Sequence, residues 1–230
     1  MKIKPPSEIE ITQIAAGLSA QCPQMAGLIS DHPWPQWRVR DGGLEGLLRM
    51  VVDQQVSVAA GQAIWNRLVE GLGGQVTPAA LLAHDVEGLR GFGLSRPKAG
   101  YARGVAEAIL DGRLDFARLQ TLDDEAAIAH LVQLKGLGRW SAEVYLMFCE
   151  ARRVLFPADD LAILEGLRRL KGLEARPTPK LARAMAEIWA PHRTFASFLL
   201  WSHYARTNDQ AKQERLEDKA RNPRSKTGVQ

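Results

Sequence analysis

The amino-acid sequence predicts an all-α protein of about ten helices joined by short connections. Three observations carry this prediction. Alternating runs of β-branched residues, the pattern of a half-buried strand, are scarce. Alanine and leucine recur at spacings of three and four residues, as on the buried face of a helix. Serine, threonine and proline stand repeatedly where a helix would begin.

The first predicted helices follow one another closely. An apolar stripe covers residues 44–52. Ser57 is placed to cap a second helix, whose apolar residues run through 60–69. Thr77 and Pro78 have the pattern of an N-cap residue followed by a proline at the first helical position.

Two further helices are predicted in the middle of the chain. Ser95 and Pro97 open a helix that continues to Ile109. Thr121 and Asp124 have the spacing of a capping box, with aspartate in place of the usual glutamate.

The last third of the chain repeats these signals. Thr178 and Pro179 again pair an N-cap residue with a proline. A final apolar helix follows Pro191 and runs to Trp201. Residues 207–230 are polar and of mixed charge, so we expect a C-terminal tail there.

The bulk composition is that of an ordinary soluble globular protein, with 46% hydrophobic and 24% charged residues. A net charge of +4 permits a polyanionic partner without establishing one. The spacing of the two cysteines, Cys22 and Cys149, fits no zinc or iron–sulfur pattern, so we expect reduced thiols in a cytoplasmic protein.

Several classes of protein are excluded by missing patterns. The five histidines are dispersed and no two have the spacing of a metal site. No apolar run is long enough to cross a membrane, and no signal for export opens the chain. The serine-hydrolase elbow and the phosphate-binding P-loop are also missing.

The most informative segment is residues 134–142, in which Gly136 and Gly138 flank one apolar residue, Leu137, between two predicted helices. Glycines allow positive φ and let the backbone approach a ligand. The unpaired N–H groups that begin the second helix suit a phosphate. An ordinary turn between two helices remains the alternative. Residues 89–93 echo this pattern, either as a second phosphate contact or as a glycine helix cap.

Side chains around this hairpin add cationic and hydroxyl groups. Lys135 and Arg139 supply positive charge and Ser141 a hydroxyl, all of which suit a DNA backbone. Gln54 and Gln55 interrupt an apolar helix pattern. Their amides either satisfy backbone groups or fill the gap left by a displaced base.

Two aspartates and two tryptophans are the remaining candidates. Asp159 and Asp160 precede a predicted helix, where one is explained as an N-cap and the other is available for chemistry. Spacing alone does not assign the two roles. Trp140 and Trp201 either pack in the core or stack on nucleobases.

Taken together, these residues resemble the helix–hairpin–helix (HhH-GPD) DNA glycosylase superfamily, and most closely its 3-methyladenine DNA glycosylase II branch. The order and spacing agree over roughly residues 44–201. The matching segments are residues 53–60, 134–142, 156–160 and 191–201.

The resemblance implies a fold of two helical subdomains with an active-site cleft between them and no N-terminal β domain. We expect a discontinuous subdomain of residues 1–40 and 153–206, which carries the catalytic aspartate. A six-helix subdomain of residues 41–152 holds the hairpin, and 207–230 form the tail.

The resemblance also implies roles for residues. Asp160 becomes the catalytic residue, with Asp159 beside it to share the N-cap. Trp140 stands where bifunctional relatives carry a lysine, so the enzyme is expected to be monofunctional. Trp140 and Trp201 match aromatic positions of the base pocket. A tyrosine that lines the pocket in some relatives falls at Val144, next to Tyr145. Val144, Tyr145 and Asp159 are therefore expected to belong to the base pocket as well.

DNA contacts follow from the same resemblance. Gln55 takes the place of a wedge inserted into the duplex, with Gln54 beside it. The hairpin of Lys135, Gly136, Leu137, Gly138, Arg139 and Ser141 is expected to hold the DNA backbone.

The implied activity is hydrolysis of the N-glycosidic bond of alkylated bases in double-stranded DNA, by a monomer that requires no cofactor and carries no iron–sulfur cluster. Relatives bind a monovalent cation through hairpin carbonyls, which here are those of Val132, Leu134 and Gly136, so Na⁺ or K⁺ is a candidate ligand. Two alternatives stay open: a bifunctional glycosylase and lyase for oxidised bases that uses Lys135, and a non-catalytic DNA-binding module.

Overall fold

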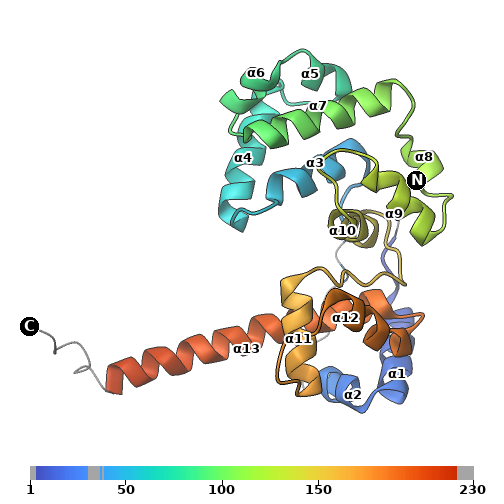
Figure 1. Cartoon of the computed structure of the whole chain (residues 1–230), viewed down its shortest axis with the longest axis vertical. Helices are drawn as coiled ribbons and strands as arrows, with labels where there is room; N and C mark the ends of the chain where they lie inside the picture. Colours follow the sequence, from blue (N-terminus) through green and yellow to red (C-terminus); the bar gives the residue numbers. More distant parts are fainter. Residues whose placement is uncertain (1–3, 31–36, 38, 222–230) are drawn as a thin grey trace, which may run out of the picture. The chain divides into compact units, whose positions relative to one another are not determined.

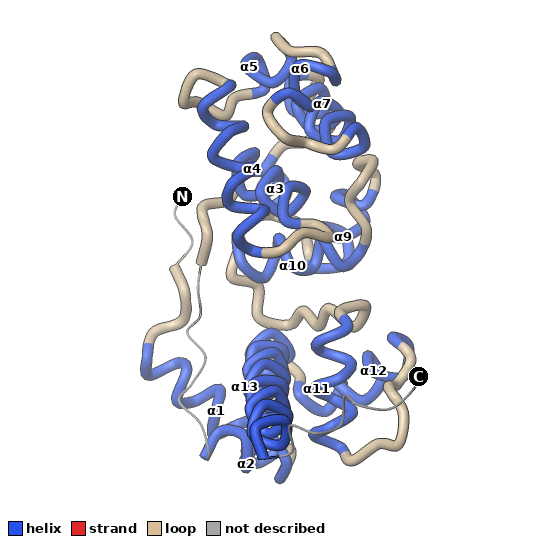
Figure 2. Tube along the Cα trace, turned by 90° about the vertical axis from the view of Figure 1, so that its left-hand side faces the viewer, coloured by secondary structure: helices blue, strands red, loops and turns tan. Residues whose placement is uncertain are grey.

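The structure is a computed structural model that describes residues 4–30, 37 and 39–221, with the side chains of these residues except at 211 and 214–221. Every regular element within these ranges is a helix (Figure 2), so the predicted all-α class is confirmed. The elements are α1 (Glu8–Gln21), α2 (Pro23–Ser30), α3 (Gly43–Asp53), α4 (Val58–Gly71), α5 (Pro78–Leu82), α6 (Val86–Gly91), α7 (Arg96–Leu110), α8 (Phe116–Leu119), α9 (Asp124–Val132), α10 (Arg139–Cys149), α11 (Leu161–Lys171), α12 (Pro179–Ala186), the 3₁₀ turn η1 (Glu187–Trp189) and α13 (Arg193–Arg221).

The chain forms two compact units, each built from two segments. Unit 1 comprises Met1–Glu8 and Trp37–Pro157, and unit 2 comprises Ile9–Gln36 and Ala158–Gln230. Helices α3 to α10 belong to unit 1, and α11 to α13 to unit 2 (Figure 1). The expected internal boundaries were 40/41 and 152/153. The observed unit 1 is therefore slightly larger than the expected hairpin subdomain and also takes in the chain before α1.

The core of unit 1 forms where the apolar stripe of α3 meets helices α4 to α7. Helix α7 packs against α5, α6 and α3, and α10 packs against α9 and α3. The buried side chains of the larger cluster are Leu48, Val52, Leu68, Leu72, Val76, Leu81, Leu89, Leu94, Ala99, Ala102 and Ala106. Burial of this apolar surface is the main force that holds the short helices together.

Three of the predicted helix caps are confirmed. The hydroxyls of Ser57, Thr77 and Thr178 accept hydrogen bonds from the backbone N–H groups of Ala60, Ala80 and Leu181, respectively. Each cap satisfies a donor that has no partner inside its helix.

The predicted cap at Thr121 is wrong. Asp123 is the N-cap of α9 and accepts from the N–H of Ala126 at 2.8 Å. The Thr121 hydroxyl instead donates to the carbonyl of Arg118. A charged carboxylate nearer the helix start is the stronger acceptor, so the cap lies two residues later than predicted.

The turn at residues 91–93 is a glycine helix end. Helix α6 ends at Gly91, and Gly93 has a φ of +100°. Its N–H donates to the carbonyl of Arg90. Of the two alternatives for residues 89–93, a phosphate contact or a glycine helix cap, the structure shows the glycine cap.

Unit 2 is built on the packing of α11 against α13. A Cβ atom at Gly166 would lie 2.8 Å from the carbonyl oxygen of Leu200, so glycine allows the two helices to approach closely. Trp189 and Phe195 of the same unit are both fully buried.

The expected tail begins as a helix. Helix α13 continues without a break to Arg221, so residues 207–221 are helical. Arg169 of α11 donates to the side chains of Thr207 and Asn208 and lies over the ring of Tyr204. These polar contacts extend the helix past its apolar segment, which hydrophobic periodicity alone did not indicate.

Candidate active site and nucleic-acid interface

Asp160 is the N-cap residue of α11. Its Oδ1 atom accepts hydrogen bonds from the N–H groups of Ala162 at 2.8 Å and Ile163 at 3.0 Å. The positive end of the helix dipole lies at the same point and suits a negative charge. The residue is half-buried. Asp160 therefore caps α11, and its side chain still reaches the surface.

Trp201 of α13 meets the same carboxylate. Its indole Nε1 donates to Oδ1 of Asp160 at 3.1 Å. The indole stacks on Phe198 with ring centroids 6.0 Å apart. Three donors thus converge on one carboxylate oxygen, which restricts how the carboxylate can turn. Of the predicted site residues, the structure brings these two together within unit 2.

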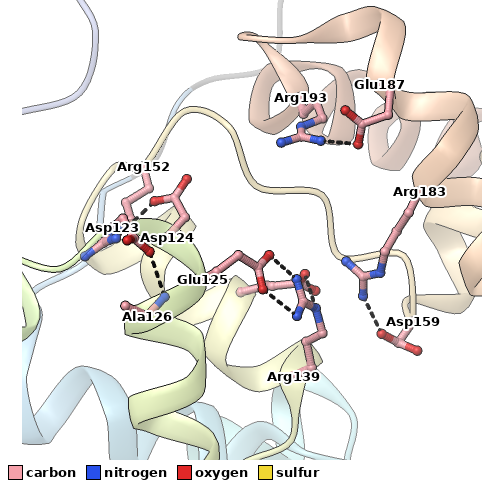
Figure 3. Close-up of polar contacts among 11 residues, drawn as sticks. Asp123, Asp124, Glu125, Ala126, Arg139, Arg152, Asp159, Arg183, Glu187 and Arg193 are labelled. Atoms are coloured by element: carbon pink, nitrogen blue, oxygen red, sulfur yellow. Dashed lines mark hydrogen bonds and ion pairs between the residues drawn. The ribbon is translucent and has the colours of Figure 1, made fainter.

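Asp159 does not share the cap, contrary to expectation. Its exposed side chain forms an ion pair with Arg183 of α12 at 2.7 Å (Figure 3). The carboxylate of Asp160 binds the start of α11, whereas that of Asp159 binds Arg183, so only Asp160 caps the helix. Arg183 was not indicated by the sequence, because its partner lies 24 residues away.

Gly136 is required by the shape of the hairpin. Its φ is +93°, and a Cβ atom at this position would lie 2.3 Å from the ring of Tyr101. Any other residue would therefore be strained and would clash. Leu137 is buried beneath the turn and anchors it to unit 1.

The start of α10 is not capped by the side chain of its N-cap residue. That residue is Gly138, which has no side chain. Lys135 is exposed and lines an open groove of about 500 Å³, together with Arg96 and Tyr101 of α7. The N–H groups of a helix start beside a cation form a site that suits a phosphate.

Arg139 is committed to protein contacts. Its guanidinium binds Glu125 of α9 (Figure 3) and Glu143 of α10. The Glu125 bond, followed by the negative charges of both glutamates, raises the pKa of Arg139 against the opposing effect of burial. Arg139 therefore ties α9 to α10, and its expected phosphate contact stays a prediction.

Ser141 differs from expectation. The residue is only 3% exposed, and its hydroxyl accepts a hydrogen bond from the Gln54 amide at 3.1 Å. A buried hydroxyl cannot reach a DNA backbone, so Ser141 supports the hairpin from inside.

The two glutamines have separate roles. The Nε2 group of Gln54 donates to the carbonyl of Gly136 at 3.2 Å as well as to Ser141. Gln54 therefore satisfies groups of the hairpin. Gln55 is exposed and has a φ of +55°, which is unusual for a residue other than glycine. The exposed position of Gln55 is compatible with the expected DNA wedge.

Trp140, Val144 and Tyr145 all lie on α10. Trp140 is half-buried in the first turn of the helix, whereas Val144 is 7% exposed. Tyr145 is 1% exposed, and its hydroxyl accepts a hydrogen bond from the N–H of Gly43 at 2.9 Å. Burial raises the pKa of Tyr145. Tyr145 is therefore a core residue that anchors α3, and it does not line the expected base pocket.

Two of the three carbonyls expected to bind a cation already accept hydrogen bonds within the protein. The carbonyl of Leu134 accepts from the N–H of Leu137 at 3.1 Å, and that of Gly136 accepts from Gln54. Val132 is exposed. A carbonyl has a second lone pair, so the cation site stays a prediction. Within the described part of the chain, no three His, Cys, Asp or Glu side chains gather to hold a metal.

The described helices include none that is both long and apolar enough to cross a membrane. Cys22 and Cys149 are both buried and form no disulfide.

The match to a family model shows which protein family this chain belongs to. A model described as HhH-GPD superfamily base excision DNA repair protein matches residues 48–191. The chain belongs to this superfamily. The matched region contains the hairpin of unit 1 and the N-cap aspartate of unit 2.

Three matches to known 3-methyladenine glycosylases cover most of both chains. DNA-3-methyladenine glycosylase 1 of Schizosaccharomyces pombe is 33% identical over 189 residues, which span 81% of this chain and 83% of that protein. A structure of an S. pombe 3-methyladenine DNA glycosylase in complex with abasic DNA has a TM-score of 0.74 at 33% identity and covers 82% of this chain and 95% of its own. A DNA-3-methyladenine glycosidase from Bacillus halodurans gives a TM-score of 0.78 at 29% identity, with coverage of 85% and 91%.

Proposed function

We propose that this HhH-GPD protein is a monofunctional DNA glycosylase that hydrolyses the N-glycosidic bond of alkylated bases in double-stranded DNA, acting as a monomer. The observation that carries the proposal is Asp160, held by two backbone N–H groups and by the indole of Trp201 at a partly exposed position. A carboxylate restrained in this way is prepared to face a developing positive charge.

DNA would be held by the hairpin of unit 1. The N–H groups at the start of α10 bind a backbone phosphate, and Lys135 adds a positive charge beside them. Gln55 enters the duplex where the damaged nucleotide leaves. Extrusion costs a few kcal/mol, and damaged pairing lowers this cost.

Release of the base follows from the chemistry of alkylated purines. A purine alkylated at N3 or N7 carries a positive charge, so it is a good leaving group and needs no strong general acid. Indoles such as Trp140 and Trp201 attract a cationic ring. Asp160 stabilises the oxocarbenium-like sugar and orients or deprotonates the attacking water, as carboxylates do in glycoside hydrolysis.

Strand cleavage is not part of the proposed reaction. It would need an amine that attacks the sugar and forms a Schiff base. Trp140, which has no amine, occupies the second position after Gly138 in place of such a lysine.

The decisive experiment replaces Asp160 with asparagine. Asparagine is a good N-cap, so Asp160→Asn preserves α11 and removes only the charge. We expect single-turnover release of bases from methylated DNA, followed by chromatography, to fall by about 100-fold or more, while binding to abasic-site DNA changes by less than about 3-fold. Release near the wild-type rate would contradict the assignment of Asp160.

A matched control is Asp115→Asn. Asp115 caps α8 through two backbone N–H groups, as Asp160 caps α11, and should tolerate the same change. Borohydride added to the wild-type reaction tests the lyase alternative, because a Schiff base would be trapped as a covalent protein–DNA adduct. We expect no adduct.

A further inference from the structure

Lys98 of α7 reaches the turn that carries the two glutamines. Its Nζ donates to the carbonyl of Val52 at 2.8 Å and to the carbonyl of Gln54 at 2.7 Å. The two carbonyls lie where α3 ends, 46 and 44 residues away in sequence. Nothing in the local pattern of α7 indicates this contact.

The contact has a clear physical basis. Carbonyls at the last turn of a helix have no partner within it, and the negative end of the helix dipole lies there. An ammonium group supplies both the donors and the charge. Lys98 is half-buried, and burial lowers its pKa, while the nearby Asp53 carboxylate opposes this effect.

The same turn is bound on its other side by the hairpin. Gln54 gives its backbone carbonyl to Lys98 and its side-chain amide to the carbonyl of Gly136 and the hydroxyl of Ser141. The next residue, Gln55, is exposed and has a φ of +55°. An L-residue stays in this conformation only where its surroundings hold it.

We propose that Lys98 is a positioning residue that holds the Gln54–Gln55 turn against the hairpin, so that Gln55 is presented to DNA in a single conformation. This inference rests on the proposed function, because it assigns Lys98 a part in nucleotide extrusion. Lys98 itself touches neither the DNA nor the reacting sugar. Loss of the Lys98 side chain lowers the rate of base release at saturating DNA more than it lowers the affinity for DNA.

The test compares Lys98→Met with Arg103→Met. Arg103 lies on the same helix and also donates to two backbone carbonyls, those of Leu82 and His84, away from the turn. Arg103→Met therefore controls for a lost cation and lost carbonyl contacts. Lys98→Arg retains the charge and the donors.

Two measurements are made on each full-length variant. Single-turnover base release from methylated DNA is expected to fall by about 10-fold or more in Lys98→Met and to stay within about 3-fold of wild type in the other two variants. Amide hydrogen exchange over residues 53–58 is expected to be about 5-fold faster or more in Lys98→Met alone.

The outcomes separate this inference from the proposed function. If wild-type protein releases no base, the proposed glycosylase activity fails and hydrogen exchange still decides whether Lys98 holds the turn. Equal exchange over residues 53–58 in Lys98→Met and Arg103→Met would overturn the inference. Faster exchange in Lys98→Met with an unchanged rate of release would overturn it as well.

Discussion

Adjacent residues of the same type have different surroundings in this protein. Asp160 receives three hydrogen bonds on one oxygen, whereas Asp159 pairs with Arg183 at the surface. Gln54 is bound to the hairpin, and its neighbour Gln55 is exposed. Asp159 is paired on the surface and Gln54 supports the fold. Asp160 and Gln55 are the members of each pair that are available for the proposed reaction.

The indole of Trp201 is testable at this scale. Trp201→Phe keeps an aromatic ring and removes the N–H that donates to Asp160. We expect single-turnover base release to fall by about 10-fold, because the carboxylate loses one of the groups that restrain it. Stability in urea should fall by about 1 kcal/mol.

Trp201→Leu separates the donor from the ring. If the N–H is what matters, Phe and Leu reduce the rate of release to a similar extent. If Trp201→Phe releases bases at the wild-type rate, the hydrogen bond to Asp160 has no part in the reaction.

At the scale of elements, α11 begins at the proposed catalytic residue Asp160 and carries a charge network along the rest of its length. Glu165 forms ion pairs with Arg168, Arg169 and Arg176. The Arg168 hydrogen bond, with further contributions from Arg169, lowers the pKa of Glu165 to about 2. Arg169 also binds α13, the helix that supplies Trp201.

The pH dependence of stability tests this network. The folded pKa of Glu165 lies below its ordinary value of 4.5, so its pairing stabilises the fold above pH 4.5 and is lost as the pH falls toward 2. Glu165→Gln should lower the free energy of unfolding by roughly 1–2 kcal/mol at pH 7, since partial exposure screens the pairs. The difference should vanish near pH 2.

Urea denaturation at several pH values measures this effect. Glu174→Gln is the control, because Glu174 is exposed in the same unit. A deficit for Glu165→Gln that stays constant down to pH 2 would show that the charge of Glu165 does not stabilise α11.

At the scale of the whole molecule, the two units supply different parts of the proposed reaction. Unit 1 holds the hairpin, Gln55 and Lys135, and unit 2 holds Asp160 and Trp201. The net charge of +4 is modest, so affinity for DNA should depend on a few placed cations more than on total charge.

The salt dependence of DNA binding tests whether a few placed cations determine the affinity. Lys135→Ala should weaken binding and reduce the slope of log Kd against log salt by about 1, the value for one lost phosphate contact. Arg113→Ala removes the same net charge, but Arg113 pairs with Asp111, so its slope should match wild type. Equal slopes for Lys135→Ala and wild type would remove Lys135 from the interface.

The sequence by itself determined the helical class, three of the helix caps, the glycine hairpin and a helix start at the Asp159–Asp160 pair. These features depend on contacts within about four residues, which local pattern reveals. It did not determine the cap at Asp123 or the length of α13.

Only the tertiary structure decided how the candidate residues divide into reacting and supporting groups. The Trp201 bond to Asp160 joins residues 41 apart, and the Gln54 bond to Gly136 joins residues 82 apart. The same holds for the burial of Tyr145. Such contacts arise when helices pack, and packing depends on side chains from the whole unit, which no local spacing encodes.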